Sequence, residues 1–195
     1  MVRWGRFASA YALLGTVALV LVWGRGGSPL LHPSPHLELA RGPAHGWSLG
    51  LGLGFAAVVV LASRLLVQRF AWARSLHQEL RPFALGLDAT GLFVLALVGP
   101  VGEELLFRAL FQPAIGLLPQ AILFGLVHYL PGRSRWAWSL WAFLFGLAMG
   151  TVFLVTGSLL GPIVAHVLVN ALNSSFLRRH DPAAAVVERG VELST

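Results

Sequence analysis

Long apolar runs separated by short polar segments make up most of this chain of 195 residues. Most of the runs approach the ~20 apolar residues that a helix needs to cross a bilayer. The pattern therefore predicts an all-α fold, a polytopic membrane bundle of about six transmembrane helices. The expected spans are Phe7–Trp23, Trp47–Leu66, Phe83–Pro100 with its continuation Val101–Phe111, Ala114–Tyr129, Trp136–Val155 and Leu159–Leu177.

Proline and glycine mark the expected breaks in these helices. Gly99-Pro100 should kink the third helix or make it re-entrant, because proline lacks a backbone donor and clashes with the preceding turn. By the same argument Pro113 should end that helix and Pro119 should interrupt the fourth span. The segment Gly24–Gly46 is rich in proline, glycine and histidine, and we expect it to be an irregular loop.

The first apolar run, Phe7–Trp23, follows basic residues and has the pattern of a signal-peptide core. Its length and the lack of a small-x-small cleavage site favour an uncleaved signal anchor. We therefore expect this run to be the first helix of the bundle.

Glycines recur every four residues in two of the spans. Gly46, Gly50 and Gly54 would form a smooth strip on one face of the second helix, and Gly146 and Gly150 would do the same in the fifth. Small residues at this spacing let helix backbones approach closely. We expect both strips to pack against other helices of the same chain.

Composition supports a membrane protein and excludes several other classes. Hydrophobic residues make up 56% of the chain and charged residues only 11%, whereas soluble domains carry about 25% charged residues. Cysteine is absent, so disulfides and thiolate chemistry are excluded. The pI is near 11.4, but the arginines lie at the ends of apolar runs and not in one patch, so we do not expect a nucleic-acid partner.

The arginines also predict an orientation. Ten of the 14 lie near the N-terminus and in the segments 64–81, 133–135 and 178–179, and a six-span zigzag places all of these on one side. The positive-inside rule makes that side cytoplasmic, with both termini inside. The lysine-free composition is typical of a bacterial protein, so the expected location is the bacterial cytoplasmic membrane. Segment 64–81 also carries Phe70 and Trp72, which predicts an interfacial amphipathic helix.

Three ionisable residues stand close together in a chain that otherwise keeps charge out of its apolar runs: Glu103, Glu104 and Arg108. Each would cost at least ~2.5–3.5 kcal/mol at membrane depth, so such residues usually have a function. Glu104 and Arg108 are four residues apart on a helix and should form an ion pair. Glu103 lies about 100° away around the helix and is the carboxylate left for general acid–base chemistry.

Two histidines occur inside later apolar runs, each with a polar or aromatic residue at helical spacing. Phe124 precedes His128 by four residues, and His166 precedes Asn170 by four, with Asn173 on the same face. A single histidine of this kind is most often packed or hydrogen-bonded. Three separate helices that each contribute polar atoms are different, because lipid offers no partner and the cheapest solution is to turn them toward one another.

In chain order, Glu-Glu-x-x-x-Arg, Phe-x-x-x-His and His-x-x-x-Asn resemble the CPBP family of intramembrane proteases, also called the ABI family, which includes CAAX prenyl protease 2 and bacteriocin-processing enzymes. The resemblance extends over about Leu85–Leu177. It divides the chain into an N-terminal two-span region at 1–83, a protease-like core at 84–178 and a polar tail at 179–195.

The resemblance implies an intramembrane endopeptidase whose catalytic residues are Glu103, His128, His166 and Asn170. Glu103 and His128 would activate a water, and His166 and Asn170 would stabilise the oxyanion. Supporting roles are expected for four further residues, Glu104, Arg108, Phe124 and Asn173. The expected substrate is a membrane-anchored protein or peptide cut near its C-terminal anchor, as in maturation or in the sorting by a myxosortase-like branch.

Metal dependence stays open between two alternatives. The family has been described as metalloproteases, and Glu103, His128 and His166 would then be ligands of a zinc ion. We favour no cofactor, because the soluble zinc-protease pattern His-Glu-x-x-His is absent and no further carboxylate would remain as a base.

Two other functions fit the same polar residues. Buried glutamate and histidine chains also relay protons in carriers, although carriers more often show internal repeats, which this sequence lacks. A non-catalytic scaffold or immunity protein on the same helices is the other alternative, although such a protein would not need the full set of polar residues.

Overall fold

The computed structural model describes residues 4–182, and the fold in this range is the expected all-α bundle. Within this range the β pairing is limited to one isolated bridge between Leu31 and Ser158. The helices in chain order are α1 (Trp4–Gly24), α2 (Arg41–Arg69), α3 (Ala71–Leu85), α4 (Ala89–Phe93), η1 (Val94–Val98), α5 (Gly99–Glu104), η2 (Leu105–Phe111), α6 (Gln112–Ile115), α7 (Leu117–Val127), α8 (Arg135–Thr156) and α9 (Leu160–Arg179).

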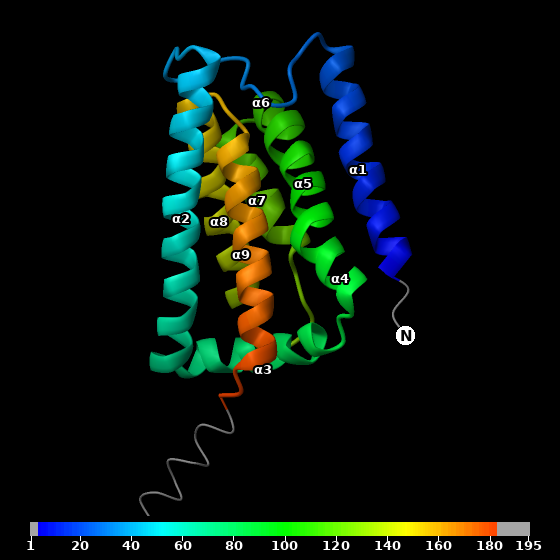
Figure 1. The fold of residues 1–195 in the computed structure, drawn as a ribbon, viewed down its shortest axis with the longest axis vertical. Helices are drawn as coiled ribbons and strands as arrows, with labels where there is room; N and C mark the ends of the chain where they lie inside the picture. Colours follow the sequence, from blue (N-terminus) through cyan, green and yellow to red (C-terminus); the bar gives the residue numbers. More distant parts are fainter. Residues whose placement is uncertain (1–3, 183–195) are drawn as a thin grey trace, which may run out of the picture.

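The long helices stand side by side, and α3 crosses one end of the bundle nearly at right angles to them (Figure 1). Helix α2 packs along α9, α8 packs along α7, and α1 lies against α5 and η2. The chain passes up and down through the bundle, so α4 to α6 run upward in Figure 1, away from α3, and α9 returns to it. The predicted interfacial helix therefore corresponds to α3.

Among residues 4–182, five helices are long and apolar enough to cross a membrane. They are Gly5–Gly24, Arg41–Arg69, Ala89–Ile115, Arg135–Thr156 and Leu160–Arg179. The expected fourth span is wrong in length, because the helix there covers only Leu117–Val127. At 1.5 Å per residue this helix is about 16 Å long, short of the ~30 Å apolar core of a bilayer. The protein is an integral membrane protein with a half-length helix inside its bundle.

Of the two alternatives at Gly99-Pro100, the re-entrant break is not observed, since the helix runs from Ala89 to Ile115. Each of its two prolines follows a turn widened by one residue. The N–H of Gly99 bonds to the carbonyl of Val94, and the N–H of Gln112 bonds to that of Phe107, each five residues back. These π-helical turns make room for a proline ring, which would otherwise meet the carbonyl four residues earlier.

The other predicted helix boundaries shift by a few residues. The third helix continues through Pro113 and ends at Gly116, whose φ of 91° lies in the left-handed region. Pro119 stands in the first turn of α7, where its missing N–H costs nothing. The loop predicted for Gly24–Gly46 is shorter, because α2 already begins at Arg41.

The predicted glycine strip on the second helix is wrong by two residues. A Cβ added at Gly46, Gly50 or Gly54 would meet no atom within 4 Å, so that face carries no close contact. The close approach is made instead through Gly52, where a Cβ would collide with the backbone of Gly161 on α9. Sequence spacing identified the helix that packs closely but not its face.

The second predicted strip, in α8, is confirmed. A Cβ at Gly146 would lie 3.1 Å from the Phe124 ring, and one at Gly150 would lie 2.6 Å from the Gln120 side chain. Gln120 also donates a hydrogen bond of 3.3 Å to the carbonyl of Gly146. Helix α7 is thus held against α8 by glycine contacts and by buried amides.

The basic segments meet at the end of the bundle that α3 crosses. The segment between α7 and α8 is bonded to α3, because Glu79 accepts hydrogen bonds from the N–H and the hydroxyl of Ser134 at 3.2 and 3.1 Å. The end of α9 is bonded to α3 through an ion pair of 3.2 Å between Arg81 and Asp181. The predicted polar tail lies mostly outside the described residues, which end at 182.

Two clusters of buried side chains join the N-terminal helices to the rest. One brings Ala56 and Val59 of α2 together with Phe107, Phe124 and Phe145. The other brings Ala18 and Val22 of α1 together with Leu105, Ala109 and Leu110, among other residues. The polar residues discussed below lie between these clusters. The division of the chain at residues 83 and 178 stays a prediction.

Candidate functional site

The expected ion pair between Glu104 and Arg108 is present and fully buried. The Oε1 atom of Glu104 lies 3.1 Å from Nη1 of Arg108, and both side chains have 0% exposure. The guanidinium also lies over the ring of Phe124, 4.3 Å from its centre. A buried cation needs such partners, since transfer of an unpaired charge from water would cost several kcal/mol.

Glu104 has a second partner that sequence spacing did not predict. Its Oε1 atom lies 2.8 Å from Nδ1 of His166. A carboxylate can only accept a hydrogen bond. Nδ1 of the imidazole therefore carries the proton and donates a hydrogen bond to Glu104. The other ring nitrogen, Nε2, then faces Glu103, 3.8 Å from its Oε2 atom. Glu104 therefore orients His166 as well as pairing with Arg108.

His128 is oriented in a comparable way by the backbone of its own helix. It follows α7 directly, and its Nδ1 atom lies 2.7 Å from the carbonyl oxygen of Phe124. The carbonyl accepts, so Nδ1 is again the donor and Nε2 is turned outward. That Nε2 atom lies 3.6 Å from Oε2 of Glu103. The four-residue spacing of Phe124 and His128 thus places the imidazole within hydrogen-bonding distance of the Phe124 carbonyl.

One oxygen of Glu103 consequently faces two imidazole nitrogens from two other helices. The separations of 3.6 and 3.8 Å exceed the 2.7–3.2 Å of a direct N–H···O hydrogen bond. All three side chains are largely buried, with exposures of 14%, 21% and 6% for Glu103, His128 and His166. The structure brings these three predicted residues together, with Oε2 of Glu103 near both imidazole nitrogens.

The two asparagines have different surroundings. Asn170 is on the wall of the same cavity as Glu103, and its amide donates a 3.1 Å hydrogen bond to the carbonyl of Leu95 in η1. Asn173 bonds away from Glu103, because its Nδ2 donates to Ser63 at 3.3 Å and its Oδ1 accepts from Arg64 at 2.9 Å. Asn173 therefore ties α9 to α2.

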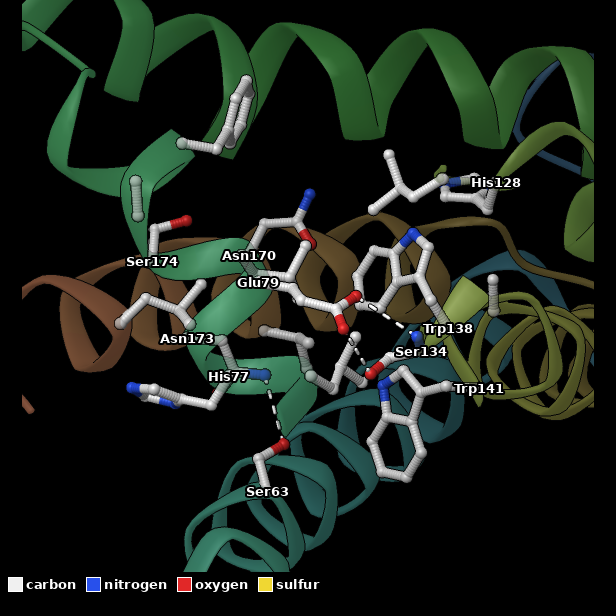
Figure 2. A pocket seen from close by; sticks show the side chains of 18 of the residues that line it. Ser63, His77, Glu79, His128, Ser134, Trp138, Trp141, Asn170, Asn173 and Ser174 are labelled. Carbon is white, nitrogen blue, oxygen red and sulfur yellow. Dashed lines mark hydrogen bonds between the residues drawn. The ribbon is translucent and has the colours of Figure 1, made fainter. Parts of the chain in front are cut away.

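A cavity of about 510 Å³ extends from Glu103 toward α3. Figure 2 shows part of its wall, with Trp138 and Trp141 on the side of α8 and Asn170 on α9. Most of the lining is apolar. Glu79 of α3 is an exception, and in Figure 2 its carboxylate turns to Ser134. The cavity is therefore an apolar channel with the polar cluster of Glu103 at its inner end.

Helix α3, which contributes several residues to the wall of this cavity, is anchored by a histidine. His77 lies 2.9 Å, through Nε2, from the carbonyl of His180 and packs edge-on against the ring of Phe176. Burial lowers the pKa of His77, and the charges of His180 and Arg81 act in the same direction. The hydrogen bond to the His180 carbonyl and the charge of Asp181 oppose that shift but do not outweigh it.

A metal site is not formed by the described side chains as they stand. Among residues 4–182, no group of three or more histidine, cysteine, aspartate or glutamate side chains has the geometry to hold a metal ion.

Sequence patterns did not predict that α1 would reach this site. Tyr11 lines the same cavity as Glu103, and a Cβ added at Gly99, one turn before Glu103, would lie 3.7 Å from the Tyr11 ring. The only signal in the sequence is a phenol in an otherwise apolar run.

Comparison with known proteins agrees with this geometry. Residues 86–172 match the family model described as type II CAAX prenyl endopeptidase, Rce1-like. A protein of Bacillus subtilis (strain 168), described as uncharacterized protein YpbD, is 29% identical to this chain over 87 residues. The aligned part is 45% of this chain and 46% of YpbD, so the alignment spans about half of that relative. No solved structure matches.

The matched region begins before Ala89 and ends after Asn170, so it contains all four of the predicted catalytic residues. The resemblance to CAAX-type intramembrane proteases, inferred from three short motifs, is confirmed over this region. Residues 86–172 of this membrane protein are thus similar to the Rce1-like CAAX prenyl endopeptidases, over the region that carries the three motifs.

Proposed function

We propose that this protein is an intramembrane endopeptidase in which Glu103 activates a water molecule for attack on a peptide carbonyl. The observation that carries the proposal is the meeting of Glu103 with His128 and His166. Separations of 3.6 and 3.8 Å are too long for direct bonds and suit one bridging water oxygen. The carboxylate would take the water proton and later pass it to the departing nitrogen, and Nε2 of His128 would accept a hydrogen bond from the water and orient it.

Stabilisation of the oxyanion falls to His166 and Asn170 in this proposal. The Nδ1 atom of His166 is held by Glu104, so only Nε2 can turn to the substrate, and it donates when it carries a proton. The amide of Asn170 keeps one N–H beyond the one bonded to Leu95. Donors fixed in a cavity that excludes water stabilise a developing charge far better than they do in bulk water.

The cavity supports a substrate that is a membrane-anchored protein or peptide. Its wall is mostly apolar and includes Trp138 and Trp141, so it suits an extended apolar segment. The cavity runs from Glu103 to the end of the bundle where the arginine-bearing segments meet. By the positive-inside rule that end is cytoplasmic, so we infer that substrate enters from the cytoplasmic side.

Matched variants test the proposal without an identified substrate. Purified protein is incubated with a bacterial membrane-protein fraction, and new protein N-termini are quantified by mass spectrometry. The compared proteins are the wild type, Glu103→Gln, His128→Ala and the control Glu38→Gln, whose carboxylate is exposed in the loop before α2. We expect new termini with the wild type and the control and none with the other two. Normal cleavage by Glu103→Gln would overturn the assignment of Glu103.

Metal dependence is tested in the same assay. The proposed mechanism needs only Glu103 and the two imidazoles, so incubation with a chelator should leave the rate unchanged. Loss of cleavage with the chelator, restored by added zinc, would show that Glu103, His128 and His166 act as metal ligands instead.

A further inference from the structure

Tyr11 of α1 is the nearest polar residue to Glu103 that lies outside the matched region 86–172 and that the proposed mechanism does not use. Both side chains line the same cavity. A phenol in a bilayer is expected to find a hydrogen-bond partner, because lipid offers none. Gly99, against which the Tyr11 ring packs, lies one helical turn before Glu103, so the Glu103 carboxylate is a candidate partner for the Tyr11 hydroxyl.

Two glycines of the long helix bring Tyr11 to this position. A Cβ added at Gly102 would lie 2.7 Å from the carbonyl oxygen of Tyr11, and one added at Gly99 would lie 3.7 Å from its ring. One turn further along α1, a Cβ at Gly15 would lie 3.3 Å from the Cα of Gly102. The two helices therefore touch backbone to backbone directly beside Glu103.

The rest of α1 keeps this contact in register. Ala18 is fully buried and Val22 nearly so, in the cluster that also contains Leu105 and Ala109 of η2. Tyr11, Gly15, Ala18 and Val22 follow one face of α1 at spacings of three and four residues. The packing thus sets the position of the phenol relative to Glu103.

We propose that Tyr11 is a positioning residue, whose hydroxyl donates a hydrogen bond to Glu103 and holds the carboxylate toward His128 and His166. This inference rests on the proposed function. It makes α1 part of the active site and not only a membrane anchor. The hydroxyl would occupy one of the acceptor positions of the carboxylate and leave Oε2 directed at the imidazoles.

The variant Tyr11→Phe separates this role from simple packing, because phenylalanine keeps the ring against Gly99 and removes only the hydroxyl. The control is Tyr129→Phe, at the other tyrosine of the chain, which is 48% exposed and lies beside Trp136. A hydrogen bond to a charged group is strong, so we expect its loss in Tyr11→Phe to lower kcat by about 10- to 100-fold. We expect KM and the unfolding temperature of Tyr11→Phe to stay at their wild-type values.

A second readout is independent of proteolysis. Carbodiimides modify carboxyl groups that the reagent can reach, and their addition to Glu103 can be followed by mass spectrometry. The charged or titratable groups around Glu103 are Tyr11, His128, His166, Glu104 and Arg108, and only the first changes in this variant. Loss of the donated hydrogen bond should make Glu103 react several-fold faster in Tyr11→Phe than in wild type or Tyr129→Phe.

The outcomes distinguish the two proposals. A lower kcat together with faster labelling of Glu103 supports the role of Tyr11. Unchanged labelling and kcat, or a loss of activity that follows a lower unfolding temperature or a higher KM, would overturn it. If Glu103→Gln cleaved normally, the proposed mechanism would fail, but faster labelling would still support the contact between Tyr11 and Glu103.

Discussion

Two adjacent glutamates on one helix have different surroundings, and the difference defines their roles. Glu104 is fully buried, and its Oε1 atom contacts both Arg108 and His166. Glu103 is partly exposed to the cavity and has no direct ion pair shorter than 3.6 Å among residues 4–182. This difference supports the proposal that Glu104 is structural and that Glu103 takes part in the chemistry.

Removal of Arg108 tests the structural role of the buried pair that it forms with Glu104. Arg108→Ala would leave the Glu104 carboxylate buried with only His166 as a partner, and breaking a buried pair typically costs about 3–5 kcal/mol. We expect this loss in the free energy of unfolding in detergent. The control Arg69→Ala removes an exposed arginine at the end of α2 and should change stability by less than about 0.5 kcal/mol. Equal stability of the two variants would contradict the structural role of Arg108.

At the scale of helices, the close contact of α2 with α9 is made through Gly52 and not through the glycine strip predicted from spacing. The helix periodicity is the same for both faces, so spacing alone could not distinguish them. The face of α2 that packs closely is the one that meets Gly161, and Gly161 lies on α9, a helix distant in the sequence.

A matched pair of substitutions tests this contact. Gly52→Ala would drive a methyl group into the backbone of Gly161, and such overpacking typically costs about 1–3 kcal/mol. Gly54→Ala meets no atom within 4 Å and should be neutral or slightly stabilising, because alanine favours helix. Thermal unfolding of both variants in detergent gives the comparison. Destabilisation by Gly54→Ala but not by Gly52→Ala would show that the helix faces are assigned wrongly.

Acidification should loosen α3, because burial lowers the pKa of His77 below its ordinary value of 6.5. The folded state then binds fewer protons at His77 than the unfolded state does. The contribution of neutral His77 to stability is therefore present above pH 6.5 and is lost as the pH falls through the lowered pKa. Hydrogen-exchange protection factors of the α3 amides should fall over this range. In His77→Gln the fall should be absent, while substitution of the exposed His36 by glutamine should leave it intact. An identical fall in His77→Gln would assign it to another group.

For the whole molecule, the sequence predicted the helical class, most spans and the meeting of Glu103, His128 and His166. It did so because apolar runs fix the spans and because polar side chains in lipid must find one another. The half-length of α7, the continuous helix through Pro100 and the approach of Tyr11 could not be predicted. The continuity through Pro100 depends on a local π-helical turn that no residue pattern announces, and the approach of Tyr11 depends on packing against Gly102, which is distant in the sequence.

Orientation is a prediction for the whole molecule. The natural absence of cysteine allows single-cysteine labelling without background. Arg133→Cys lies at the end of the bundle that α3 crosses, and Ser34→Cys lies in the loop whose neighbour Leu31 pairs with Ser158 at the opposite end. A membrane-impermeant maleimide applied to intact spheroplasts should label only Ser34→Cys. Labelling of Arg133→Cys alone would reverse the orientation and the proposed route of substrate entry.

The most direct test of the central claim is the initial rate of cleavage of an identified substrate by Glu103→Gln. Loss of a general base typically reduces the rate by about 10²- to 10⁴-fold, and we expect a loss of this size while Glu38→Gln keeps the wild-type rate. The unfolding temperatures of both variants should match that of the wild type. A Glu103→Gln rate equal to that of the wild type would contradict the account of this protein as a glutamate-dependent intramembrane protease.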